Sequence, residues 1–193
     1  AVLREVQRET LAGLDPDLVA RVEWIGTPPD AFDGAIIGNE VIDALPVERF
    51  RIDADGPQSL GVNVVDGRLA DHSAPAGQRL RDALAAVEAD LDAPLPEDYR
   101  SELCVDLASW IETVTEPLRR GAVLLADYGY PRREYYHPDR SGGTLVCQYR
   151  HRAHFDPFGW PGLTDLSTFV DFTAVADGLV AAGLDLTGFT TQA

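Results

Sequence analysis

Two short, continuous apolar runs constrain the fold of this chain more than any other feature. Residues 34–37 and 122–126 contain only small and aliphatic side chains and have polar residues close by on both sides. Strands of a parallel sheet that are covered on both faces show this pattern, whereas strands with one solvated face alternate apolar and polar residues. We therefore expect the two runs to form adjacent parallel strands, buried on both faces, in an open α/β sheet.

Helical periodicity flanks both runs. Residues 3–14, 79–91 and 172–182 each carry apolar side chains three or four positions apart, which places them on one face of a helix. The longest stripe predicts a helix over residues 103–118 and consists of Leu103, Leu107, Trp110, Ile111, Val114 and Leu118. Strands therefore alternate with helices along the chain, as in α/β proteins.

Residues 47–71 depart from this alternation. Strand-like patterns at 49–52 and 60–65 are separated by Asp55-Gly56-Pro57, and Asp66-Gly67 closes the second of them. Turn residues between short strands are typical of antiparallel hairpins. A chain of 193 residues suits one domain better than two. The sequence thus predicts a single domain over residues 1–193 with an antiparallel β insertion at 47–71.

Charge and hydropathy exclude several kinds of partner. The chain has 32 Asp and Glu against 16 Lys and Arg, a formal charge of −16, and a phosphate backbone would repel it. The apolar runs are too short to span a bilayer, and no targeting segment opens the sequence. We expect no nucleic-acid or membrane partner. Cys104 and Cys147 lie far apart in apolar stretches, so we expect buried thiols rather than a disulfide or metal site.

A set of short motifs in a fixed order carries a family resemblance. The segments are residues 39–47 (NEVIDALPV), 125–129 (LADYG), 134–138 (EYYHP), 143–145 (GTL), His151, 156–157 (DP), 161–162 (PG), 165–166 (DL) and 170–172 (VDF). Together they resemble the MidA family, which includes the mitochondrial complex I assembly methyltransferases. The resemblance implies a Rossmann-like class I methyltransferase sheet and S-adenosyl-L-methionine as cofactor. It also implies a protein arginine as methyl acceptor, which in mitochondrial members belongs to a respiratory complex I subunit.

The first candidate site follows the first apolar run. Ligands of open α/β sheets bind beyond the carboxyl ends of the strands, and Asn39, Glu40 and Asp43 occupy that place. If Asn39 starts a helical turn, Glu40 and Asp43 share a face and can hold a guanidinium by charge-assisted hydrogen bonds. We assign Glu40 and Asp43 as catalytic, and Asn39 to substrate and cofactor. The alternative is a structural helix start, with Asn39 as cap and acids favoured by the helix dipole.

Further candidates come from later motifs. Asp127 and Tyr128 follow the second run. We assign Asp127 as a third catalytic residue, a candidate for orienting the acceptor, and Tyr128 as a substrate-binding candidate for lining its pocket; an ordinary strand-end turn is the alternative. His137 and His151 are candidate substrate-binding residues. His151 and His154 are three residues apart, but no carboxylate-flanked motif accompanies them, so we predict no metal site.

Two features leave the activity open. The glycine-rich loop and the ribose-binding acid of such folds are absent from these 193 residues and are expected upstream. We therefore expect an internal piece of a longer protein, cytoplasmic in a bacterium or in the mitochondrial matrix in a eukaryote. The leading hypothesis is an arginine methyltransferase. The alternative is a catalytically silent interaction or assembly module that retains the methyltransferase fold.

Overall fold

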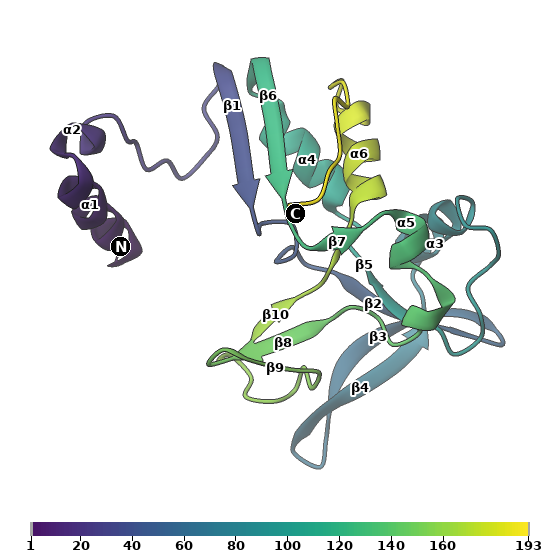
Figure 1. The fold of residues 1–193 in the computed structure, drawn as a ribbon. Helices are drawn as coiled ribbons and strands as arrows, with labels where there is room; N and C mark the ends of the chain where they lie inside the picture. Colours follow the sequence, from purple (N-terminus) through teal and green to yellow (C-terminus); the bar gives the residue numbers. More distant parts are fainter. Residues whose placement is uncertain (1, 193) are drawn as a thin grey trace.

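The parallel strand pair predicted from the apolar runs is present at the centre of the molecule. The computed structural model describes residues 2–192. Strands β1 (Phe32–Asn39) and β6 (Leu118–Ala126) pair in parallel, with Ile36 opposite Val123 (Figure 1). The prediction of adjacent parallel strands is therefore confirmed, and the chain has the expected α/β fold.

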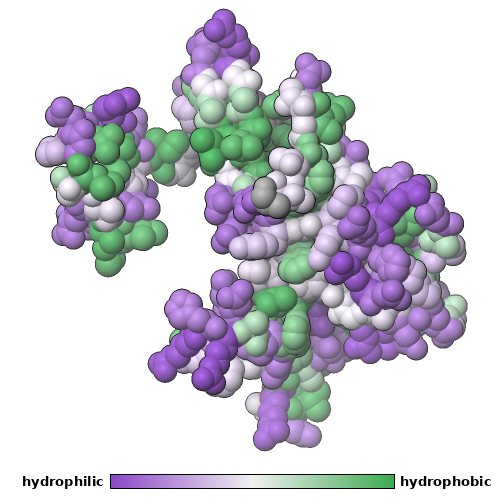
Figure 2. All heavy atoms as spheres, viewed as in Figure 1, coloured by the Kyte–Doolittle hydropathy of each residue, from purple (hydrophilic) through white to green (hydrophobic). Residues whose placement is uncertain are grey.

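The prediction that both faces of these strands are buried was wrong. Helices α4 (Leu107–Thr115) and α6 (Phe172–Ala181) pack on one face, where Leu125 contacts their apolar side chains. The opposite face carries Ile37 and Leu124, whose exposed fractions are 73% and 62%. Figure 2 shows an apolar patch over this part of the molecule. Successive strand residues point to opposite faces, and within residues 2–192 helices cover only one of them.

An antiparallel sheet follows β1 and is larger than predicted. Strands β2 (Glu48–Asp53), β3 (Gly56–Val65), β4 (Arg68–Pro75) and β5 (Arg100–Leu103) pair in the order β4-β3-β2-β5. The sheet thus extends past residue 71 and includes a strand from much later in the chain. Helix α3 (Gln78–Glu88) packs against it through Leu80 and Leu84, which join Phe50 and Tyr99 in the larger apolar core.

The long helical stripe is shorter in the structure. Leu103 belongs to β5 and Leu118 to β6, so α4 covers only the middle of the predicted span. Asp106 stands at the N-cap position of α4, and Pro117 has no backbone N–H to continue the helix beyond it. An apolar periodicity cannot separate a helix from the apolar strands that adjoin it.

The remaining elements lie around the carboxyl ends of β1 and β6. Strands β7 (Gly129–Tyr130) and β11 (Val170–Asp171) pair in parallel. In the chain, β7 is followed by α5 (Arg132–Tyr135) and the 3-10 turn η1 (Pro138–Arg140). A small antiparallel sheet has the order β10-β8-β9 and consists of β8 (Val146–Tyr149), β9 (Arg152–His154) and β10 (Asp165–Ser167).

The first helices stand apart from this body. Helix α1 (Val2–Leu14) is amphipathic as predicted, but neither it nor α2 (Pro16–Val19) has a buried residue (Figure 1). Trp24 attaches to α1 by donating a hydrogen bond to Gln7 at 2.7 Å. Across residues 2–192, every helix is too short or too polar to cross a bilayer.

Candidate functional site

The chain reverses sharply where β1 and β6 end. Asn39 lies opposite Ala126, and the Glu40 N–H donates to the Ala126 carbonyl at 2.9 Å. Glu40 has a φ of 50°, in the left-handed region that non-glycine residues seldom adopt. This conformation ends the strand and leaves the side chains of Asn39 and Glu40 exposed to solvent. We call this place, with Asn39, Glu40, Asp43, Asp127 and Tyr128, the carboxyl edge.

Asp127 holds the segment that follows Glu40. Its Oδ2 accepts hydrogen bonds from the backbone N–H groups of Val41, Ile42 and Asp43, at 3.1, 2.9 and 3.3 Å. Its Oδ1 accepts from the Tyr128 N–H at 2.9 Å. Both oxygens are thus bound to backbone donors. Asp127 is a positioning residue for the loop that presents the neighbouring carboxylates.

No helix begins at Asn39, so the structural alternative of a helix N-terminus was wrong. Residues 40–45 form bends and turns, and the carboxylate that binds their N–H groups comes from Asp127, 84–86 residues later in the chain. Glu40 and Asp43 therefore do not share a helix face. Both nevertheless belong to the same loop at the carboxyl edge.

Four carboxylates gather at the carboxyl edge, those of Glu40, Asp43, Asp127 and Asp165, and we call them the acidic cluster. Burial raises the pKa of Asp43, and the nearby charges of Asp127, Glu40 and Asp165 raise it further, whereas a hydrogen bond with Ser167 lowers it. Among residues 2–192, none of these four carboxylates forms an ion pair. Carboxylates that repel one another favour a cation between them. Such a site can bind a guanidinium or an ammonium group.

Asp165 and Ser167 were missed as site residues. They belong to β10 and approach Asp43 from the other side, and the Thr168 N–H donates to the Asp43 carbonyl at 3.1 Å. The only signal in the sequence was the Asp165-Leu166 motif in the family resemblance. It carried no information about which side chain Asp165 would face.

The position after Tyr128 accepts only glycine. A Cβ at Gly129 would lie 2.1 Å from the carbonyl oxygen of Val170, because β7 and β11 approach closely there. The Val170 N–H donates to the Tyr128 carbonyl at 2.8 Å. This pairing holds the Tyr128 backbone, while its side chain remains 61% exposed beside the acidic cluster. Tyr128 is therefore an exposed side chain at the carboxyl edge, and its role in lining an acceptor pocket stays a prediction.

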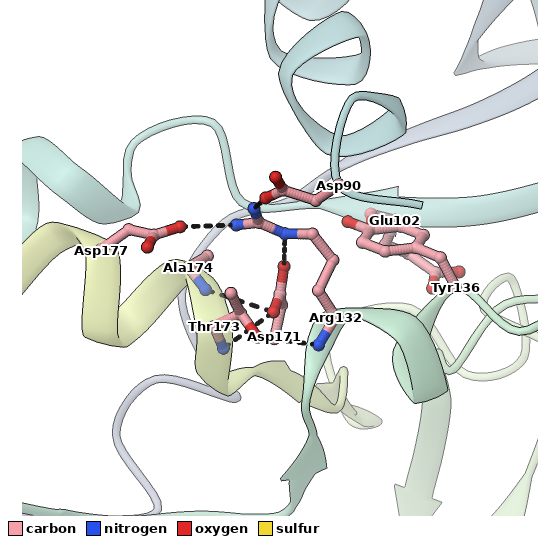
Figure 3. Close-up of polar contacts among 8 residues, drawn as sticks. All are labelled: Asp90, Glu102, Arg132, Tyr136, Asp171, Thr173, Ala174 and Asp177. Atoms are coloured by element: carbon pink, nitrogen blue, oxygen red, sulfur yellow. Dashed lines mark hydrogen bonds and ion pairs between the residues drawn. The ribbon is translucent and has the colours of Figure 1, made fainter. Parts of the chain in front are cut away.

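A buried ion-pair network fixes the elements behind β7 and β11. Figure 3 shows the Arg132 guanidinium among three carboxylates. Arg132 donates to Asp171 at 3.0 Å and to Asp177 at 3.1 Å, and also pairs with Asp90. The second oxygen of Asp171 caps α6 by accepting from the Thr173 N–H at 3.0 Å. We call Arg132 and its three carboxylates the Arg132 network; it ties α5 to α6 and to the loop after α3.

The two predicted histidines lie elsewhere. The His137 ring accepts from the Asp139 N–H at 3.2 Å and caps η1, next to Tyr99. His151 occupies the exposed turn between β8 and β9. Neither joins the acidic cluster in the structure. In the described part of the chain, no group of three or more His, Cys, Asp or Glu could hold a metal, and both cysteines are free thiols.

Solved structures of similar proteins define the class. A crystal structure of a COG1565 superfamily member from Burkholderia thailandensis, bound to S-adenosyl-homocysteine, is 43% identical with a TM-score of 0.88. A native crystal structure of an uncharacterized superfamily member from the same organism is 41% identical, also with a TM-score of 0.88. Each match covers 98% of this chain. The parallel strands and the polar edge at their carboxyl ends thus belong to a class I methyltransferase fold.

The family follows from the sequence match. Residues 1–190 match the family described as "Putative S-adenosyl-L-methionine-dependent methyltransferase". The chain belongs to this family, which is the MidA family expected from the motifs, and the family's cofactor is S-adenosyl-L-methionine. A curated relative from Caenorhabditis elegans, "Protein arginine methyltransferase NDUFAF7 homolog, mitochondrial", is 28% identical over 84% of this chain.

The chain is much shorter than these relatives. It spans 48% and 50% of the two solved structures and 38% of the Caenorhabditis elegans protein. The carboxyl edge described above is therefore one part of a larger molecule in those relatives.

Proposed function

We propose that the protein containing this chain transfers a methyl group from S-adenosyl-L-methionine to an arginine side chain of another protein. The observation that carries the proposal is the acidic cluster at the carboxyl edge, which has no cation partner within residues 2–192. A guanidinium is planar, permanently charged and suited to two carboxylates at once. The arginine acceptor in the name of the Caenorhabditis elegans relative supports the same choice.

Each residue of the cluster has a distinct task in this reaction. Glu40, exposed and projecting from a left-handed backbone, binds the guanidinium and orients the accepting nitrogen. Asp43 has a raised pKa and accepts the proton that the methylated nitrogen releases. Asp127 keeps the loop in place through its four backbone hydrogen bonds.

The proposed reaction requires the methyl donor to lie next to this cluster. When bound, S-adenosyl-L-methionine supplies the electrophilic methyl group. Asn39 is an exposed polar residue at the same edge and would contact the donor from this chain, whereas Tyr128 would line the acceptor pocket. The 193 residues contain no G-x-G-x-x-G loop, so they supply only the acceptor side of such a site.

The test is Glu40→Gln in the full-length gene product that contains these residues. Loss of one charge-assisted contact costs about 1.5–3 kcal/mol, or roughly ten- to a hundredfold in single-turnover rate with an arginine acceptor. Binding of S-adenosyl-homocysteine and the melting temperature should stay unchanged. Glu112→Gln, an exposed site on α4, is the matched control. An unchanged methylation rate in Glu40→Gln would contradict the proposal.

A second candidate function is the catalytically silent assembly module. In that case the full-length protein would bind its partner without transferring a methyl group. The test is transfer of a radiolabelled methyl group from the donor to an arginine of any protein in a cell extract. Such transfer would contradict the silent module and support the enzyme.

A further inference from the structure

The turn between β8 and β9 is a basic feature on an acidic molecule. Arg150, His151 and Arg152 follow one another there, and all three are exposed. We call them the basic turn. Arg150 and His151 have φ values of 49° and 61°, so both central residues of the hairpin are left-handed. Two-residue hairpins of this kind favour Asn and Gly, and bulky residues occupy the turn at a conformational cost.

The arginines of the basic turn are free of acidic partners. Neither Arg150 nor Arg152 forms an ion pair with any residue between 2 and 192. The chain has 32 acidic residues against 16 basic ones, and six of its other fourteen arginines form ion pairs within residues 2–192. Two neighbouring unpaired arginines therefore form a local positive site in a negative field.

Aromatic packing holds the basic turn in place. The Tyr149 and Trp160 rings stack with centroids 5.0 Å apart, and the His154 ring meets Trp160 edge-on at 5.5 Å. The Arg150 guanidinium lies 5.3 Å from the Tyr149 ring centroid. The turn is thus ordered before any partner binds, which lowers the entropic cost of binding.

The small sheet connects the basic turn to the acidic cluster. Val146 at the start of β8 lies opposite Ser167, and the N–H of the next residue, Thr168, donates to the Asp43 carbonyl at 3.1 Å. From Val146 the strand runs outward for four residues to Arg150, about 13 Å at the rise of a β-strand. Figure 1 shows β8 and β10 leading away from the ends of β1 and β6, and Figure 2 shows hydrophilic atoms at the outer end of this hairpin.

We propose that the basic turn binds acidic side chains of the acceptor protein, about four to six residues from the methylated arginine. The inference rests on the proposed function. An extended acceptor segment with its arginine at the acidic cluster would reach the basic turn over that spacing. The negative acidic cluster and the positive basic turn together fix the direction of the acceptor segment. They also disfavour segments that are basic throughout, because the basic turn would repel them. The net charge of −16 disfavours nucleic acid or an anionic membrane as the partner.

The experiment uses the full-length gene product and 15-residue peptides with one central arginine. Each peptide carries a pair of Glu, Gln or Lys residues, placed at the fourth and fifth positions either before or after that arginine. We expect the better Glu peptide to exceed its Gln counterpart about three- to tenfold in kcat/KM, as for two partly exposed ion pairs. Arg150→Glu combined with Arg152→Glu should reverse the preference toward Lys. Arg150→Gln with Arg152→Gln should abolish it without reversal.

The control pair is Arg21→Glu with Arg68→Glu, two exposed arginines that form no ion pair within residues 2–192. This pair should keep the preference for Glu peptides. Fluorescence anisotropy with the same peptides separates the two proposals, because it reports binding even when no peptide is methylated. A Glu preference that survives in the Arg150 and Arg152 variants would overturn the inference. Competition by RNA or anionic vesicles at equal charge concentration would overturn it as well.

Discussion

Glu40 and Asp127 at the carboxyl edge differ in role because their surroundings differ. Glu40 follows β1 and Asp127 follows β6, so both occupy the same kind of position in the sequence. The Glu40 side chain is exposed, whereas the Asp127 oxygens accept four backbone N–H groups. Glu40 is therefore available to an acceptor, and Asp127 acts through the loop that it holds.

Asp127→Asn should therefore affect stability as well as activity. The amide replaces one acceptor oxygen with a donor that faces backbone N–H groups, and an unsatisfied buried donor costs about 1–3 kcal/mol. The pKa of Asp43 should fall, because the Asp127 charge is one of the causes that raise it. Chemical denaturation and carbon-13 NMR titration of Asp43 measure the two effects. An unchanged free energy of unfolding with a reduced methylation rate would instead make Asp127 a direct acceptor ligand.

The Arg132 network determines how α5, α6 and β11 stand behind the carboxyl edge. The side chains of Arg132 and Asp171 are only 10% and 9% exposed, whereas those of Asp90 and Asp177 are more than half exposed. The contact of Arg132 with Asp171 is thus the buried one, and the other two carboxylates add charge at the surface (Figure 3). Removing one partner of a buried pair leaves the other uncompensated.

Arg132→Leu should lower the free energy of unfolding by about 3–5 kcal/mol, because Asp171 would remain as a buried charge without its partner. Arg133→Leu is the matched control: it removes the adjacent exposed arginine, which pairs with Asp92 at the surface, and should cost less than about 1 kcal/mol. Urea denaturation of both variants gives the comparison. Equal losses would show that the Arg132 network is no more important than a surface ion pair.

At the scale of the whole molecule, the proposed function makes this chain one side of a methyltransferase site. The acidic cluster, Tyr128 and the basic turn lie on connected elements around the ends of β1 and β6. The crystal structure bound to S-adenosyl-homocysteine matches 98% of this chain over 48% of its own length. The apolar face of β1 and β6 with Ile37 and Leu124 remains open within residues 2–192.

The 193-residue chain by itself should bind S-adenosyl-homocysteine at least about a hundredfold more weakly than the full-length Burkholderia thailandensis relative. Two charge-assisted contacts from a glycine-rich loop and a ribose-binding acid account for a difference of that size, and these 193 residues lack the loop. Isothermal calorimetry on both proteins measures it. Affinities within about threefold of each other would mean that the residues of this chain hold the cofactor.

Local patterns in the sequence were sufficient for much of the fold. The two apolar runs predicted the parallel pair of β1 and β6, and the turn residues after Asp53 and Val65 predicted the hairpin. Ordered motifs were sufficient to predict the family, which the match over residues 1–190 confirms. These features depend on neighbours in the chain, so periodicity and turn chemistry encode them.

Tertiary structure alone decided how the site is built. Asp127 meets the N–H groups of residues 41–43 across 84–86 positions, and Asp165 approaches Asp43 from a strand late in the chain. The sequence placed His137 and His151 in the site, but the structure puts them on η1 and in the basic turn. Strand order and loop paths decide which distant carboxylates lie close together, and local periodicity contains no information about either.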